Sequence, residues 1–181
     1  CKWTAGFNRQ LPTLDMIDEN FVVNSVTTFL AARGFDIEQR RTTTQTGVDL
    51  RAKHPSSGEL WLVEAKGQTS AAIGSRHHGK PFNSSQIRVH VAMALYAAAA
   101  LRQLHPDRTA VHVAIALPDD SAHRKRVVAI SQILDLTGIE VLWVSATGQV
   151  TLSGRSAGPI TSVWMVPSCS SSPGPIRKTS R

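Results

Sequence analysis

The spacing of apolar residues predicts a helix followed by three strands in the first part of the chain. Over residues 15–33 apolar side chains recur every three or four positions, which predicts a helix that ends before Gly34. Three strand-like segments follow, over 36–42, 47–53 and 60–66. In the last two, polar and apolar residues alternate, and the turn-forming residues of 54–59 join them. We therefore expect these two strands to pair as an antiparallel hairpin.

The second part of the chain alternates helices with continuous apolar strands. After a loop rich in Gly, Ser and basic residues, an alanine-rich pattern predicts a long helix over 84–104 that ends before Pro106. The remaining elements are predicted, in chain order, as a strand over 109–117, a helix over 121–136, a strand over 139–145 and an edge strand over 149–152, with room for one more strand over 160–166. The order αβββαβαβ predicts an α/β protein with a central mixed sheet and helices on both faces, a three-layer α/β/α arrangement.

The length fits one domain of ordinary size. The 181 residues contain 41% apolar and 18% charged side chains, a globular composition. We expect an irregular lead-in over 1–12, a single domain over 13–167 and a disordered tail over 168–181, where Ser, Pro and Gly dominate. The longest apolar run, 91–101, is too short to span a bilayer, so no membrane partner is expected.

Charge and cysteine content narrow the function classes. Lys and Arg number 20 against 13 acidic residues, and this mild excess favours a polyanionic partner. Cys1 and Cys169 are not paired at metal-ligand spacing, which excludes a zinc site or disulfide framework and fits a reducing compartment such as the cytoplasm. The sequence contains no Walker-type loop, nucleophile elbow or His-Glu metalloprotease motif, which leaves NTPase, esterase and zinc-protease functions without supporting residues.

Several charged residues stand at positions expected to be apolar. Glu64 and Lys66 leave one face of an otherwise apolar strand, and Asp49 lies on the neighbouring arm of the hairpin. Glu19 continues the apolar stripe of the first helix at its N-terminal end. If these faces coincide, carboxylates converge beside one lysine and form an oxygen-lined site that suits Mg²⁺ or Mn²⁺. The alternatives are an exposed ion pair on the hairpin and, for Glu19, a favourable interaction with the helix dipole.

Two short motifs carry a resemblance to a known family. Gly47-Val48-Asp49 and Val63-Glu64-Ala65-Lys66, set on a hairpin between two helices, resemble the PD-(D/E)xK nuclease superfamily over residues 15–117. The order αβββαβ matches the core of this restriction-endonuclease-like fold, and Val48 stands in place of the motif's proline. The resemblance implies a Mg²⁺-dependent deoxyribonuclease, more specifically an endonuclease, in a restriction, repair or mobile-element context. It also makes a homodimer an expected assembly, because cutting both strands of a duplex needs two sites.

The resemblance also assigns roles to individual residues. Asp49 and Glu64 would be metal ligands together with the Ala65 backbone carbonyl. Lys66 would be the catalytic lysine and Glu19 an accessory carboxylate. A cation on these ligands would activate water, while Lys66 would orient or deprotonate that water or stabilise the transition state by its charge.

Further candidates stand beside these motifs. Gln68 leaves the same strand face as Lys66, and Gln86 on the long helix corresponds to a glutamine found near the metal in some members of the family. His90, four residues after Gln86, is expected as a core or boundary histidine with satisfied hydrogen bonds rather than as a functional residue. The residues expected to contact nucleic acid are basic and lie in the loop before the long helix or at the start of the next helix: Arg76, His77, His78, Lys80, Arg124 and Lys125.

Two other interpretations stay open. The same fold can serve as a catalytically silent DNA-binding or assembly module, in which no divalent ion stabilises the protein. Alternatively, the chain is an unrelated α/β protein whose Asp49, Glu64 and Lys66 form only an ion pair on a hairpin.

Overall fold

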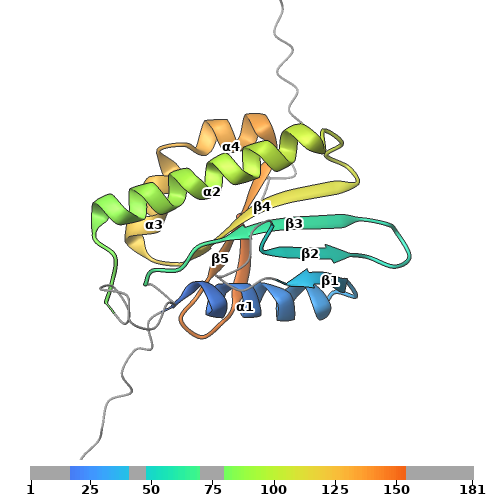
Figure 1. The fold of residues 1–181 in the computed structure, drawn as a ribbon, viewed down its shortest axis with the longest axis horizontal. Coiled ribbons are helices and arrows are strands. Elements are labelled where there is room, and N and C mark those ends of the chain that lie inside the picture. The colour runs from blue at the N-terminus through green and yellow to red at the C-terminus, as the bar shows by residue number, and fades with distance from the viewer. Residues whose placement is uncertain (1–16, 41–47, 70–79, 154–181) are drawn as a thin grey trace, which may run out of the picture.

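Helices and strands alternate around one central sheet in the computed structural model, which describes residues 17–40, 48–69 and 80–153 (Figure 1). In chain order the elements are α1 Glu19–Ala31, β1 Asp36–Arg40, β2 Leu50–Lys53, β3 Leu60–Ala65, α2 Ser84–Leu104, β4 Val111–Pro118, α3 Ser121–Val128, α4 Ser131–Thr137, β5 Ile139–Val144 and β6 Val150–Ser153. The expected segments 1–12, 160–166 and 168–181 lie outside the described residues. No helix in the described ranges is long and apolar enough to cross a membrane.

The six strands form one mixed sheet in the order β1-β2-β3-β4-β5-β6. β2 and β3 pair antiparallel, with Leu50 opposite Val63, which confirms the predicted hairpin. β3, β4 and β5 run parallel, because α2 connects the first two and α3 with α4 connects the next two. The edge strands β1 and β6 are antiparallel to their neighbours. The α/β class with a mixed sheet is therefore confirmed.

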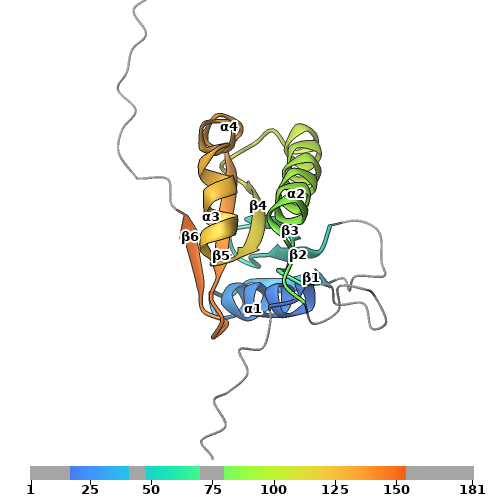
Figure 2. The same cartoon turned by 90° about the vertical axis from the view of Figure 1, so that its left-hand side faces the viewer.

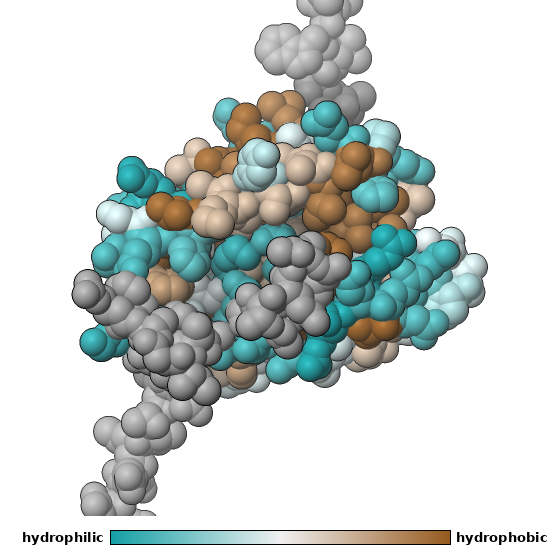
Figure 3. All heavy atoms as spheres, viewed as in Figure 1, coloured by the Kyte–Doolittle hydropathy of each residue, from teal (hydrophilic) through white to brown (hydrophobic). Residues whose placement is uncertain are grey.

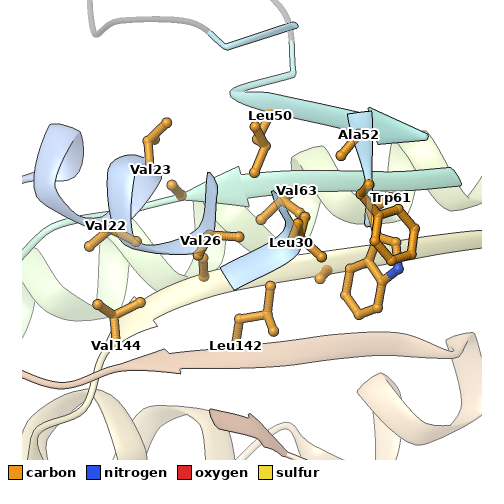
Figure 4. Packing of buried hydrophobic residues seen from close by; sticks show 14 of the residues in the cluster. Val22, Val23, Val26, Leu30, Leu50, Ala52, Trp61, Val63, Leu142 and Val144 are labelled. Atoms are coloured by element: carbon orange, nitrogen blue, oxygen red, sulfur yellow. The ribbon is translucent and has the colours of Figure 1, made fainter. Parts of the chain in front are cut away.

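Helices cover both faces of this sheet (Figure 2). On one face, α1 packs Val26 and Leu30 against side chains of β2, β3 and β5 in a continuous apolar cluster (Figure 4). On the other face, α2, α3 and α4 cover a second cluster. Side chains of β3 alternate between the two, so Val63 lies on the α1 face and Leu62 on the α2 face. Glu64 and Lys66 follow the Leu62 side of this alternation, toward α2.

The predicted helix over 121–136 is wrong in one respect, because the structure divides it. α3 ends at Val128 and α4 begins at Ser131. Between them Ile130 adopts φ −123° and ψ 11°, and its N–H bonds to Val127 across the shorter spacing of a 3₁₀ turn. No Gly or Pro marks this break, so the apolar periodicity continues through it. The observed order is αβββαβααββ rather than αβββαβαβ, with β6 at the expected edge position.

Helix starts follow local capping chemistry. α1 begins after Asp18, whose carboxylate accepts a hydrogen bond from Phe21 N at 2.7 Å, and not at the expected residue 15. α2 covers the predicted range and starts with a capping box, in which Asn83 and Gln86 each accept a hydrogen bond from the other's backbone. Backbone hydrogen bonds of Gln68 with Ile17 and Phe82 bring the N-termini of both helices close to the end of β3.

Candidate functional site

Four charged side chains meet at the carboxyl end of β3. Lys66 lies at their centre, and its Nζ donates to Glu64 Oε1 and to the Ala65 carbonyl oxygen, each at 2.7 Å. Glu19 Oε2 lies 3.6 Å and Asp49 Oδ2 3.9 Å from the same nitrogen. The two arms of the hairpin and the start of α1 therefore deliver three carboxylates and one backbone carbonyl to a single ammonium. We call these residues, Glu19, Asp49, Glu64, Ala65 and Lys66, the acid–lysine cluster.

Strand geometry explains how the hairpin contributes. Glu64 and Lys66 are two residues apart, so they project from one face, while the intervening Ala65 is buried on the other. Asp49 comes directly before β2, and its Oδ2 accepts a hydrogen bond from Ala65 N at 2.7 Å. This bond holds the Asp49 carboxylate beside the end of β3. The carboxylate takes the place of a backbone carbonyl of the neighbouring strand as the acceptor for Ala65 N.

A close backbone contact brings in Glu19. Gly67 follows the cluster, and a Cβ built on it would lie 2.5 Å from Glu19 N and 2.6 Å from the Asp18 carbonyl carbon. One residue later, Gln68 N donates to Ile17 O at 2.8 Å. Only glycine fits this approach, so Gly67 is a positioning residue that the sequence analysis missed. The available signal was a glycine immediately after a strand that ends in charged residues.

Burial and mutual charge shift the pKa values of the cluster. The side chains of Asp49, Glu64 and Lys66 are 13–14% exposed. Burial raises the pKa of Glu64, although the Lys66 ammonium opposes the shift, and burial likewise raises the pKa of Glu19. Burial alone would lower the pKa of Lys66, but Glu64 and Glu19 outweigh it and the pKa is raised. Lys66 is therefore charged at neutral pH, and the carboxylates around it outnumber it.

The cluster is not arranged as a closed metal site. Across the described ranges, no three His, Cys, Asp or Glu side chains form a group that could hold an ion. Lys66 already donates to two of the oxygens that the sequence analysis assigned to a metal, those of Glu64 and Ala65. The ammonium would repel a divalent ion bound to the same oxygens, so the position of Lys66 opposes ion binding there unless the ammonium moves away.

The two candidate glutamines have different surroundings. Gln86 Oε1 accepts a hydrogen bond from Asn83 N at 2.9 Å and so completes the cap of α2. Gln68 is half-buried, and its backbone joins Ile17 to Phe82 through one hydrogen bond on each side. The structure thus gives Gln86 a role at the helix start, and it places Gln68 on the backbone bridge next to Gly67.

His90 lies one helical turn after Gln86. Its ring packs on Phe82, with the ring centres 4.3 Å apart. Burial, the charge of Lys66 and the neighbouring His123 lower the pKa of His90. The imidazole is therefore neutral at pH 7 and adds no charge beside the cluster. Its buried Nδ1 has no hydrogen-bond partner among the described residues, unlike the satisfied histidine that the sequence led us to expect.

The candidate nucleic-acid contacts divide into three groups. Arg76, His77 and His78 lie outside the described residues. Lys80 and Lys125 are exposed. Arg124 pairs with Asp119, Nη2 to Oδ2 at 2.9 Å, and its guanidinium lies 4.6 Å from the centre of a Trp143 ring. These contacts anchor the exposed Arg124 side chain beside β5, and its contact with nucleic acid stays a prediction.

Comparisons with known proteins add little. A scan against protein-family models finds no match, and a search of curated proteins also finds none. Among solved structures, the chain is similar to an fdxN element excision controlling factor protein from Anabaena variabilis, with 17% identity and a TM-score of 0.43. That alignment covers 73% of this chain and 96% of the other. None of these comparisons assigns a family or an activity.

Proposed function

We propose that this chain is a metal-dependent nuclease of the PD-(D/E)xK type that hydrolyses phosphodiester bonds in DNA. The observation that carries the proposal is the acid–lysine cluster, in which Asp49, Glu64 and Lys66 converge at one end of a hairpin. The succession of a helix, three strands, a helix and a strand from α1 to β4 supports a restriction-endonuclease-like fold. The excess of basic residues supports a polyanionic substrate.

The chemistry of the donor set fits Mg²⁺ or Mn²⁺. Asp49, Glu64 and the Ala65 carbonyl would hold the ion, with Glu19 as a further carboxylate. These are oxygen donors, which hard divalent cations prefer, and the cluster contains more carboxylates than ammonium groups. The hydrogen bond from Ala65 N to Asp49 orients that carboxylate before any ion arrives.

Each residue of the cluster then has a defined task. A divalent ion held by Asp49, Glu64 and the Ala65 carbonyl would lower the pKa of a water molecule and neutralise phosphate charge. Lys66 presents its ammonium to the phosphate and stabilises the negative charge that grows on its oxygens. In the reaction, the water oxygen would bond to phosphorus and lose a proton to solvent, one phosphorus–ester oxygen bond would break, and the departing oxygen would take up a proton from solvent. Glu64 and Glu19 keep Lys66 protonated, so it acts as a charge and a donor rather than as a base.

A nuclease assay with matched variants tests the proposal. Plasmid, linear duplex, branched and single-stranded DNA are incubated with the protein in Mg²⁺, in Mn²⁺ and in chelator. We expect metal-dependent cleavage by the wild type and by the control variants Lys53→Ala and Asp36→Asn, which alter exposed residues of the neighbouring strands. We expect no cleavage by Lys66→Ala or Asp49→Asn, provided that circular dichroism shows both folded. Equal activity in wild type and both cluster variants refutes the assignment.

A second candidate is a catalytically silent DNA-binding or assembly module of the same fold. The observation that favours it is Lys66 itself, which already serves as the cation for the carboxylates. In that case Mn²⁺ should leave the melting temperature unchanged, because only a ligand that binds the folded state stabilises it. Stabilisation by Mn²⁺ that Asp49→Asn abolishes would favour the nuclease.

A further inference from the structure

The exposed face of α2 is apolar where it passes the acid–lysine cluster. Between Arg88 and Arg102 the helix contains no Asp, Glu, Lys or Arg. Met93 is 59% exposed and Tyr96, the single tyrosine of the chain, is 79% exposed. Figure 3 shows apolar side chains gathered along this helix. A surface helix normally turns charged or polar residues to water, so this face indicates a binding surface.

This face forms one wall of a pocket that the cluster completes. The pocket measures about 450 Å³, a size typical of small-ligand sites. Its lining combines two residues of the cluster with one face of α2: Glu64, Lys66, Val89, Ala92, Met93, Tyr96 and Ala97. A ligand in this pocket would have an apolar, planar part against α2. A divalent ion on Glu64, together with Lys66, would favour an anionic part at the other end.

We propose that this pocket binds an unpaired nucleotide next to the phosphate that is cleaved, with its base stacked on Tyr96 beside Met93. This inference rests on the proposed function and specifies its substrate as DNA with an unpaired nucleotide at the cleavage position. A nucleotide has the required parts, because its base offers a flat apolar face and its phosphate a negative charge for Lys66. Stacking on an aromatic side chain accepts any base, so the pocket selects for strand state rather than sequence.

An intact duplex fits this face poorly. B-form DNA presents phosphates along its outside and keeps its bases stacked within, so duplex binding relies on rows of Lys and Arg. α2 offers no such row between Arg88 and Arg102. An unpaired base, by contrast, has already lost its stacking partners and gains them back on Tyr96.

Continuity with the cluster favours a substrate over a protein partner. Val89, Met93 and Tyr96 line the same pocket as Glu64 and Lys66. A second copy of the chain seated on these side chains would cover the residues to which catalysis is assigned. The apolar wall and the acid–lysine cluster therefore act together only if the occupant is the molecule being cleaved.

Fluorescence titrations with 2-aminopurine DNA test this inference. The probes are one single-stranded oligodeoxynucleotide and its blunt duplex, each carrying the fluorescent base, with Ca²⁺ replacing Mg²⁺ so that binding is measured without cleavage. We expect quenching by stacking with the single strand, and about five- to a hundredfold weaker binding of this probe by Tyr96→Ala. Tyr96→Phe keeps the ring and should bind like the wild type, as should Leu104→Ala, which changes an exposed side chain of α2 outside the pocket.

The possible results separate this inference from the proposed function. Cleavage and binding of the duplex with no quenching of the single strand, or equal binding by Tyr96→Ala, overturns the inference and leaves the nuclease standing. A protein that binds neither probe overturns both. If sedimentation shows that Tyr96→Ala converts a dimer to a monomer without changing DNA binding, the face belongs to a second copy and the inference is wrong.

Discussion

Gly67 packs against the amide of Glu19 so closely that a Cβ at position 67 would lie 2.5 Å from the Glu19 nitrogen. The contact joins the first residue of α1 to the second residue after β3. It fixes where the N-terminus of α1 passes the end of the sheet and so sets the distance from Glu19 to Lys66. The apolar packing of α1 lies on the face of the sheet away from Lys66, so this packing by itself would not determine the distance from Glu19 to Lys66.

Gly67→Ala should therefore damage both stability and activity. The added methyl must displace the backbone of Asp18 and Glu19, and we expect the free energy of unfolding to fall by about 1–3 kcal/mol. The control is Gly58→Ala in the turn before β3, where φ is 75° and no atom lies within 4 Å of the added carbon. It should cost about 1 kcal/mol through backbone conformation alone and leave cleavage intact. Urea unfolding and the nuclease assay measure the two effects, and full activity in Gly67→Ala would contradict this role.

Lys66→Met should improve metal binding while it abolishes cleavage. The ammonium and a divalent ion compete for the Glu64 and Ala65 oxygens, so removing the ammonium removes the competitor. We expect Mn²⁺ to bind the variant at least tenfold more tightly by calorimetry, a modest part of the ~4 kcal/mol interaction of unit charges 4 Å apart near a protein surface. Lys53→Met, on the exposed edge of the hairpin, should bind Mn²⁺ like the wild type. Weaker binding by Lys66→Met would show that the lysine supports the ion instead of excluding it.

Glu64→Gln should stabilise the folded protein at neutral pH. Burial raises the pKa of Glu64 above its ordinary 4.5, so the folded state holds this proton more tightly than the unfolded chain does. Stability contributed by the neutral carboxyl is therefore lost as the pH rises from 4.5 through the raised pKa. The variant keeps the shape without the charge and avoids that loss. Urea unfolding should show the variant more stable than the wild type at pH 7, with the difference in stability shrinking toward pH 4.5. A variant less stable than the wild type at pH 7 would show that the ion pair with Lys66 outweighs the cost of burying the Glu64 charge.

Variants of Gln86 test whether its side chain caps α2 or takes part in catalysis. Its side chain accepts the Asn83 N–H at the start of α2, so Gln86→Ala should lower the free energy of unfolding by about 1 kcal/mol. Gln86→Glu retains an acceptor suited to the capping box and should restore most of this stability. We expect both folded variants to cleave DNA within a few-fold of the wild type. A loss of activity of more than a hundredfold in Gln86→Ala with normal stability would instead assign it to catalysis.

The parts of the fold that the sequence predicted well are those with strong local signals. α2 was predicted with its observed bounds, because apolar periodicity, an Asn cap and a following proline all agree. The β2–β3 hairpin followed from alternation and turn residues. The division between α3 and α4 was not predicted, because Ile130 leaves the helical conformation without a Gly or Pro to mark the change.

In the candidate site, too, the sequence predicted what local patterns decide and missed what distant contacts decide. Alternation along β3 places Glu64 and Lys66 on one face whatever the rest of the chain does. Arg124, in contrast, was predicted to contact nucleic acid from its place in a basic run. That contact stays a prediction, and the structure adds contacts with Asp119 and Trp143 that the run did not indicate. Its partner on β5 is 19 residues away in the sequence, and no local pattern predicts a contact of that kind.

The sequence by itself determined most of the elements, the hairpin and the polar face of β3, because hydrophobic spacing and turn chemistry act between near neighbours. Tertiary structure alone decided that Glu19 joins Asp49 and Glu64 around Lys66, and that an apolar wall of α2 faces that cluster. Both arrangements depend on where α1 and α2 pass the end of β3. Close packing between segments that are distant in the sequence fixes these positions, and the contact of Gly67 with Asp18 and Glu19, which leaves no room for a Cβ, is one example.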